Sequence, residues 1–142
     1  MRSVATAEGC WLVYTDGASR GNPGPAAIGV VIFDDKDREH HRISEAIGRA
    51  TNNEAEYQAA IAGLEAALAL GARHVELRMD SELVVRQLDS RYRVRNPRLK
   101  RLFARMEDLR WRFASFTATA IPREENALAD KLANQALDRS GG

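Results

Sequence analysis

The sequence has very little cysteine: Cys10 is the single example among 142 residues. One cysteine cannot form an intramolecular disulfide or a multi-cysteine zinc cage, and it fits a reducing compartment, so we expect a cytoplasmic protein. Long hydrophobic runs are also missing. The longest nearly apolar run, residues 26–33, has eight residues, whereas a membrane-spanning helix needs about 20. Residues 1–10 contain no apolar stretch of signal-peptide length, so we expect neither secretion nor membrane insertion.

A strong net charge is missing as well, because the chain carries only +1 at neutral pH. The balance is uneven, however. Residues 91–112 hold nine Lys or Arg and two acidic residues, which gives this segment +7 and leaves −6 for the rest. Such a split favours polyanion binding by the basic segment and cation binding by the acidic remainder. The alternative is a solvated basic helix face.

Length and composition predict one globular domain. Hydrophobic residues make up 44% of the chain and charged residues 29%, and a chain of this length can bury a proper core. Internal repeats and low-complexity tracts are absent. We expect a single domain over residues 10–138, with loose termini at 1–9 and 139–142.

Hydrophobic periodicity predicts an α/β fold. Apolar stretches at 11–15 and 26–33 and a more polar, loosely alternating stretch at 39–47 predict three antiparallel strands, the last at an edge, and the Gly- and Pro-rich stretch 17–25 predicts a turn between the first two. A helix follows, capped by Asn52 or Asn53. The remaining predicted elements are a strand at 75–79, helices at 81–88 and from residue 97, a strand at 113–121 and a helix at 124–137. This order predicts a mixed five-stranded sheet flanked by helices.

Four carboxylates fall at strand ends or near helix starts. Asp16 and Asp80 end two predicted strands, Glu56 lies in the first turn of the helix after Asn53, and Asp130 lies in the second turn of the last helix. Half-buried carboxylates are costly unless they are paired or bound to a cation, and oxygen ligands suit Mg²⁺ or Mn²⁺. Each acid also has a local alternative: a turn former, a helix cap, a helix N-terminal charge and a surface residue, respectively.

Two segments suit phosphate. The turn GASRGNPGP (residues 17–25) offers backbone N–H groups with little side-chain obstruction, although it is no Walker loop. Thr51, Asn52 and Asn53 place three hydrogen-bonding side chains at a helix N-terminus. The alternatives are an ordinary hairpin loop and plain helix capping.

Together these segments resemble type 1 ribonuclease H. The motifs are YTDGASRGNPGP (14–25), TNNEAEYQAAIAGLEAAL (51–68), MDSELVVRQL (79–88) and REENALADKLANQA (123–136), in family order, and the resemblance runs from about residue 11 to residue 137. It implies a five-stranded mixed sheet of order 3-2-1-4-5, with helices on both sides. It also implies endonucleolytic cleavage of the RNA strand of RNA/DNA hybrids with two divalent ions, leaving 5′-phosphate and 3′-OH ends.

The resemblance assigns roles to particular residues. The metal-binding acids would be Asp16, Glu56, Asp80 and Asp130, with Mg²⁺ as the expected ion and Mn²⁺ as a substitute. Glu54 lies in the wrong helical phase. The expected nucleic-acid contacts are Gly17, Ser19, Asn22, Thr51, Asn52 and Asn53. Of these, Asn22 and Thr51 would hold DNA phosphate, and Asn52 and Asn53 would contact the minor groove.

The chain departs from the family pattern in four places, one of them Ser19, which stands where some members have a Cys after the TDG motif. Many members carry a His in the loop before the last helix, whereas residues 116–130 contain none, so Arg123 is the nearest candidate for that catalytic role. Glu82 and Arg86 stand where family members have hybrid-contacting Gln residues. The basic stretch 91–98 is shorter than the basic handle of some bacterial members. The alternative function is a hybrid-binding module of the same fold without catalysis. We expect a monomer, and no protein partner is implied.

Overall fold

The computed structural model describes residues 9–89 and 93–141, and it contains one five-stranded sheet of order β3-β2-β1-β4-β5. The predicted strand order is therefore confirmed. The chain order of the elements is β1 (Cys10–Ser19), β2 (Gly24–Phe33), β3 (Glu39–Ala50), α1 (Asn52–Ala69), β4 (His74–Met79), α2 (Glu82–Leu88), α3 (Pro97–Arg110), β5 (Ser115–Ala120), the 3₁₀ turn η1 (Arg123–Asn126) and α4 (Ala127–Ser140).

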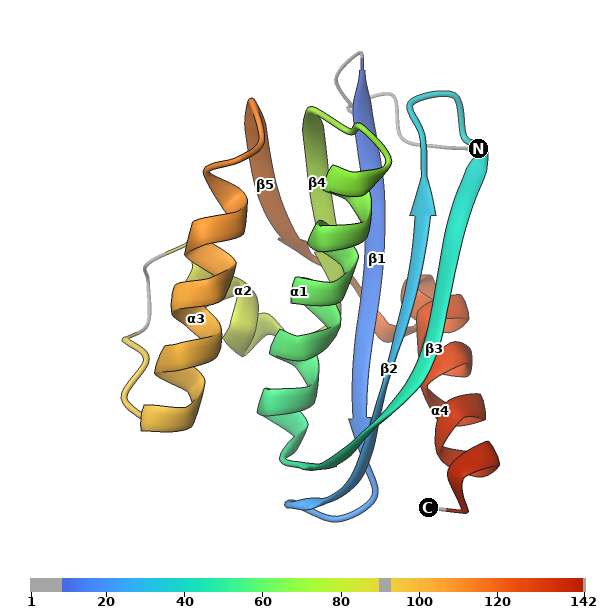
Figure 1. Cartoon of the computed structure of the whole chain (residues 1–142), viewed down its shortest axis with the longest axis vertical. Coiled ribbons are helices and arrows are strands. Elements are labelled where there is room, and N and C mark those ends of the chain that lie inside the picture. Colours follow the sequence, from blue (N-terminus) through green and yellow to red (C-terminus); the bar gives the residue numbers. More distant parts are fainter. Residues whose placement is uncertain (1–8, 90–92, 142) are drawn as a thin grey trace.

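Helices cover both faces of the sheet (Figure 1). On one face α1 packs against β1 and β2, and α3 packs against α1. On the other face α4 packs against β2 and β3. The main core lies on the α1 face, where the fully buried side chains include Val13, Val30, Ile32, Leu64, Leu77 and Met106. None of the helices within the described ranges combines the length and apolar character that crossing a bilayer requires.

The first two strands are longer than predicted. The antiparallel pairing of β1 with β2 continues past Asp16 to the Ser19–Ala26 pair, so the turn predicted over residues 17–25 shrinks to four residues between the strands. Parallel pairing of β1 with β4 ends earlier, at Tyr14 and Arg78. The prediction that Asp16 ends its strand is therefore wrong. Asp16 lies within β1, just beyond the point where β4 stops.

The helix starts also differ in detail from the predictions. Thr51, not Asn52 or Asn53, is the N-cap of α1: its hydroxyl accepts from Glu54 N–H at 3.1 Å, and Glu54 accepts from Thr51 N–H at 2.8 Å. Because this reciprocal capping box fixes the first turn, Glu56 lies in the second turn. Ser81 caps α2, which removes the alternative that Asp80 serves as its cap.

The last helix begins and ends later than predicted. Residues 123–126 form the 3₁₀ turn, so Asp130 lies in the first turn of α4. The helix continues through Ser140, and Arg139 donates to the carbonyl of Ser44 at 2.8 Å. Residues 139 and 140 therefore belong to the folded part, and the boundary predicted at 138 is too early. Of the loose termini predicted at 1–9 and 139–142, residues 1–8 and 142 lie outside the described residues.

Candidate active site

The structure brings the four predicted carboxylates together. Oxygen atoms of Asp16, Glu56 and Asp80 all lie within 4.8 Å of one another. Asp130 approaches from α4 and lies near enough to Asp16 to raise its pKa. The parallel pairing of β1 with β4 brings Asp80 near Asp16, and the packing of α1 and α4 on the sheet adds Glu56 and Asp130.

Gly17 sets the distance between β1 and α1. A Cβ atom at this position would lie 2.2 Å from the carbonyl carbon of Ala55 and 2.4 Å from the nitrogen of Glu56, so only glycine allows this approach. The backbone N–H of Gly17 donates to Oε1 of Glu56 at 2.8 Å. Gly17, predicted as a nucleic-acid contact, therefore also packs α1 on the strand and holds the Glu56 carboxylate.

Gly29 sets the distance between β2 and α4 in the same way. It lies opposite Asp16 in the β1–β2 ladder, and a Cβ atom there would lie 2.0 Å from the carbonyl oxygen of Ala129. The helix therefore rests directly on the strand, one residue before Asp130. Sequence reasoning missed Gly29 because a glycine inside an apolar strand gives no local sign of what packs over it.

Burial and mutual repulsion raise the pKa values of Asp16 and Glu56. Burial raises the pKa of Asp16 to about 9, with further contributions from the charges of Glu56 and Asp80 and from Asp130. Burial also raises the pKa of Glu56 to about 8; the Gly17 N–H opposes this rise, as does the positive charge of Arg123. Without a cation, the Asp16–Glu56 pair therefore keeps protons to a higher pH than ordinary carboxyl groups do.

The acid cluster suits a hard divalent cation. Its ligand atoms are all carboxylate oxygens, which Mg²⁺ and Mn²⁺ prefer, and no histidine or cysteine belongs to the cluster found among the described residues. A cation there would relieve the repulsion that raises the pKa values of Asp16 and Glu56. The residues present therefore fit a divalent metal.

Two asparagines that sequence reasoning missed bind Asp80 and Asp130. Asn126 is 1% exposed, and its side-chain nitrogen donates to the carbonyl of Thr15 at 2.9 Å and to Oδ2 of Asp80 at 3.3 Å. Asn134, one turn after Asp130, donates to Oδ1 of Asp130 at 3.2 Å. The sequence could suggest Asn134 from its i, i+4 spacing, but the contacts of Asn126 require the folded sheet.

The predicted nucleic-acid contacts lie together at the start of α1. The backbone N–H of Asn52 donates to Oδ1 of Asn22 at 2.9 Å, and Oδ1 of Asn52 accepts from the N–H of Ser19 at 3.1 Å. The Ser19 hydroxyl donates to the carbonyl of Ala50 at 2.8 Å. These bonds join the β1–β2 loop to the helix N-terminus, beside the Thr51 cap and the half-buried Asn53.

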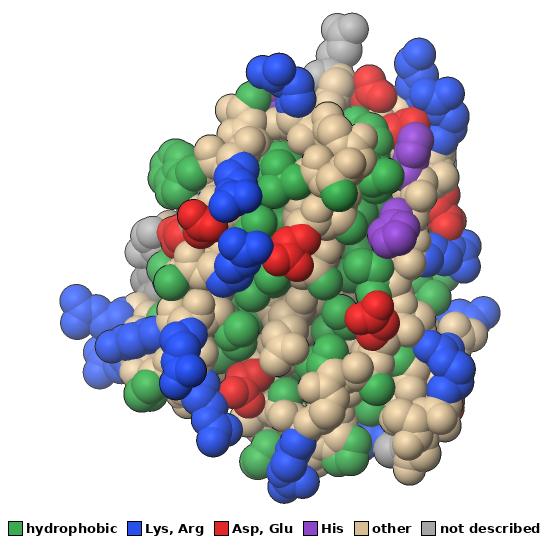
Figure 2. All heavy atoms as spheres, in the orientation of Figure 1, with side chains coloured by type: hydrophobic (Ala, Val, Ile, Leu, Met, Phe, Trp, Pro, Cys, Tyr) green, Lys and Arg blue, Asp and Glu red, His purple; other side chains and the backbone are tan. Residues whose placement is uncertain are grey.

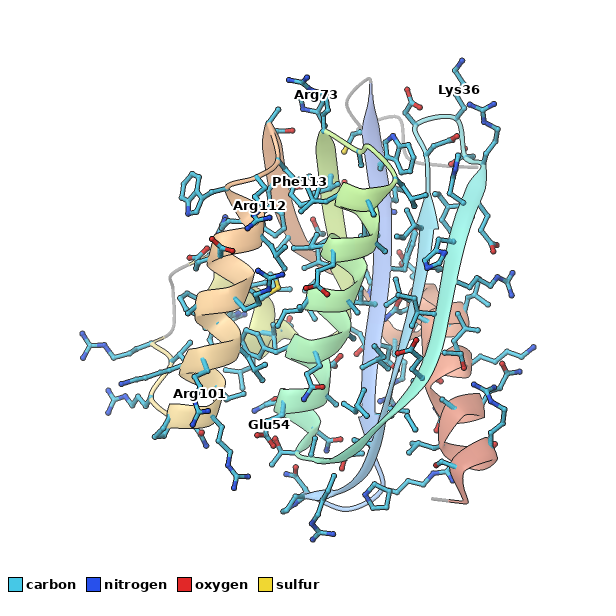
Figure 3. The ribbon with its side chains drawn as sticks, in the orientation of Figure 1. Lys36, Glu54, Arg73, Arg101, Arg112 and Phe113 are labelled. Atoms are coloured by element: carbon cyan, nitrogen blue, oxygen red, sulfur yellow. The ribbon has the colours of Figure 1, made fainter. Side chains whose placement is uncertain are left out.

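Basic side chains gather near the start of α3, at the same end of the molecule as the start of α1 (Figure 2). Figure 3 places Arg101 and Glu54 at this end. We call the exposed residues Arg93, Arg95, Arg98, Lys100 and Arg101 the α3 basic cluster. Arg98 lies 4.0 Å from Glu54, which links the cluster to the first turn of α1. Residues 91 and 92 of the predicted basic segment lie outside the described residues.

Arg123 is exposed on η1 and lies near enough to the acids for its charge to lower the pKa of Glu56. Glu82 and Arg86, which stand at the family's Gln positions, lie 3.9 Å apart on α2.

The sequence of this chain is similar to those of known proteins. The family model described as Reverse transcriptase-like matches residues 14–136. Ribonuclease HI of Halobacterium salinarum is 48% identical over 125 residues, which cover 88% of this chain and 63% of that protein. The chain spans between 35% and 63% of the length of the first curated relatives it matches.

The fold of this chain is also similar to solved structures of RNase H1 proteins. The crystal structure of RNase H1 from Halobacterium salinarum superposes with a TM-score of 0.89 at 46% identity, covering 92% of this chain and 98% of that chain. LC11-RNase H1 in complex with an RNA/DNA hybrid gives a TM-score of 0.87 at 45% identity, covering 93% and 99%.

Proposed function

This chain belongs to the type 1 ribonuclease H family, and we propose that it is an endonuclease that hydrolyses the RNA strand of RNA/DNA hybrids. The observation that carries the proposal is the meeting of Asp16, Glu56 and Asp80 within 4.8 Å, with Asp130 beside them. LC11-RNase H1, a relative of high similarity, has been crystallised with such a hybrid, which supports the same substrate class here.

The four acids would hold two divalent ions, Mg²⁺ first and Mn²⁺ as a substitute. When bound, such ions supply an activated water and offset the negative charge that develops on the scissile phosphate. The residues of this chain position the carboxylates that would hold the ions. Glu56 is fixed by the Gly17 N–H, and Asp16 is fixed within the sheet by its ladder with Gly29. Cation binding would favour the charged forms of Asp16 and Glu56, whose pKa values are raised in the cation-free fold.

Hybrid recognition needs contacts to both strands, because the substrate has a 2′-OH on one side and a deoxyribose backbone on the other. We assign the DNA phosphate to Asn22 and Thr51, and the minor groove to Asn52 and Asn53. Gly17 and Ser19 complete this surface. The hydrogen bonds between the β1–β2 loop and α1 make the surface rigid before the substrate arrives. The α3 basic cluster would add phosphate contacts without base readout.

Arg123 replaces the loop histidine of other members in this proposal. Its charge acts on Glu56, and its exposure allows it to contact the substrate. An arginine cannot serve as a general base at neutral pH, so its role would be to stabilise phosphate charge and assist product release.

A substrate panel tests the proposal. The RNA strand of an RNA/DNA hybrid, double-stranded RNA and a DNA duplex with a single ribonucleotide are each labelled and incubated with the chain and Mg²⁺. We expect cleavage of the hybrid RNA to products with 5′-phosphate and 3′-OH ends. Salt-sensitive hybrid binding without cleavage would instead favour the alternative, a non-catalytic hybrid-binding module.

A cytoplasmic location, a monomeric state and the absence of a protein partner stay predictions. The buried single cysteine, Cys10, agrees with the first. Sedimentation of the purified chain tests the second.

A further inference from the structure

Asn126 lies at the junction of η1 and α4 and connects two parts of the site. Its side-chain nitrogen contacts both the carbonyl of Thr15 and Oδ2 of Asp80, at 2.9 and 3.3 Å. Thr15 directly precedes Asp16 in β1. One buried amide therefore joins the backbone that carries Asp16 to the carboxylate that follows β4.

This side chain does not do what its position predicts. Asn126 is the N-cap residue of α4, where an asparagine oxygen ordinarily accepts from a free N–H of the first turn. No such bond forms, and Oδ1 of Asn126 is buried with no hydrogen-bond partner in the described part of the chain. A missing cap and an unsatisfied buried oxygen both cost stability. These two losses of stability have an explanation if the function of the Asn126 side-chain nitrogen is to hold Asp80.

We propose that Asn126 is a positioning residue that fixes the Asp80 carboxylate for cation binding; this rests on the metal-dependent function proposed above. Asp80 is the least buried of the three clustered acids, and its like-charged neighbours repel it. A neutral amide restrains Asp80 without introducing a positive charge that would compete with a divalent ion. The tether to Thr15 fixes Asp80 relative to Asp16.

The test measures Mn²⁺ affinity by electron paramagnetic resonance, without nucleic acid, for wild type, Asn126→Ala and Asn126→Ser. Serine is a good N-cap that is too short to replace the amide, so Asn126→Ser preserves the helix start while removing the tether. We expect both variants to bind Mn²⁺ about 10- to 100-fold more weakly, the usual effect of losing a group that orients a metal ligand. On the hybrid, kcat should fall while KM stays unchanged, because Asn126 is buried away from the substrate.

Asp34→Ala is the matched control. Asp34 is a 2% exposed polar side chain that accepts from the backbone of Lys36 and Arg38 in the β2–β3 turn, away from the acids. Its loss should lower the melting temperature and leave Mn²⁺ affinity unchanged. Wild-type Mn²⁺ affinity in Asn126→Ser would overturn the proposal. If wild type fails to cleave hybrid but both Asn126 variants lose Mn²⁺ affinity, the proposed function fails and the positioning role stands.

Discussion

Asp16 and Gly29 are partners in the β1–β2 ladder, and the absence of a side chain at Gly29 is what brings Asp130 to Asp16. A Cβ atom on Gly29 would lie 2.0 Å from the carbonyl oxygen of Ala129 and 2.7 Å from the nitrogen of Ala133. The backbone of α4 therefore touches the strand. Two acids 114 positions apart in the chain meet because one residue between them has no side chain.

Gly29→Ala should displace α4 and separate Asp130 from Asp16. Overpacking of this kind costs about 1–3 kcal/mol, and the atoms that the new methyl group would meet belong to the backbone, which cannot turn aside. We expect lower stability in urea unfolding and a loss of hybrid cleavage larger than the stability change explains.

Leu137→Ala is the control for that variant. Leu137 is a 1% exposed residue of α4, and its truncation costs about 2–5 kcal/mol by leaving a cavity, without pushing the helix away. Assays are run at a temperature at which both variants are folded. Equal activity in the two would contradict the role given to Gly29.

Asp16→Asn should stabilise the cation-free protein at neutral pH. Because the pKa of Asp16 is raised from 3.8 to about 9, the folded chain keeps a proton that the unfolded chain releases, so this group makes folding less favourable as pH rises through that interval. The amide does not titrate. We expect Asp16→Asn to exceed wild type by at least about 1 kcal/mol at pH 7, the value of one pKa unit, with the difference vanishing near pH 4.

The measurement is urea unfolding in EDTA across that pH range. A constant difference between Asp16→Asn and wild type would mean that the Asp16 carboxyl is not perturbed in the fold.

Arg123→Ala should lower turnover about tenfold, equal to about 1.4 kcal/mol of transition-state stabilisation, because the positive charge beside Glu56 is lost. Arg123→Lys keeps the charge and should retain most of the turnover. Single-turnover and steady-state rates on the hybrid separate chemistry from product release. If Arg123→Ala slows turnover only slightly, Arg123 does not replace the family's histidine.

The α3 basic cluster should contribute salt-dependent affinity. Replacing Arg98 and Arg101 by Ala should weaken hybrid binding and reduce the slope of log affinity against log salt by about 1 for each phosphate that is no longer neutralised. Arg73→Ala is the control, since Figure 3 places Arg73 at the opposite end of the molecule. An unchanged slope in the double variant would mean that the cluster is a solvated helix face.

Much of the fold follows from local patterns, and the exceptions have physical causes. Residues 26–33 are predicted well because they form one continuous apolar run, and the helix after Thr51 is predicted well because good helix formers follow its cap. The composition of the stretch after Asp16 predicts a turn, because Gly, Pro and Asn dominate it, but ladder bonds from β2 extend the strand to Ser19. A sequence shows local preferences and not the neighbour that overrides them.

The candidate site, like the fold, follows only in part from local sequence patterns. The four acids are visible in the sequence as motifs, but their meeting depends on Gly17 and Gly29, which act through close backbone contacts. Asn126 gives no signal at all, because its two partners lie in β1 and after β4. Positioning residues of this kind become visible only when the sheet is assembled.

The central claim is that Asp16, Glu56, Asp80 and Asp130 form one metal-dependent hydrolytic centre. The most direct measurement is cleavage of an RNA/DNA hybrid labelled on the RNA strand, by wild type in Mg²⁺, Mn²⁺ or EDTA and by Asp16→Asn in Mg²⁺. We predict RNA fragments with either metal, none in EDTA and none with the variant. Cleavage that persists in EDTA, or in Asp16→Asn, would contradict the account.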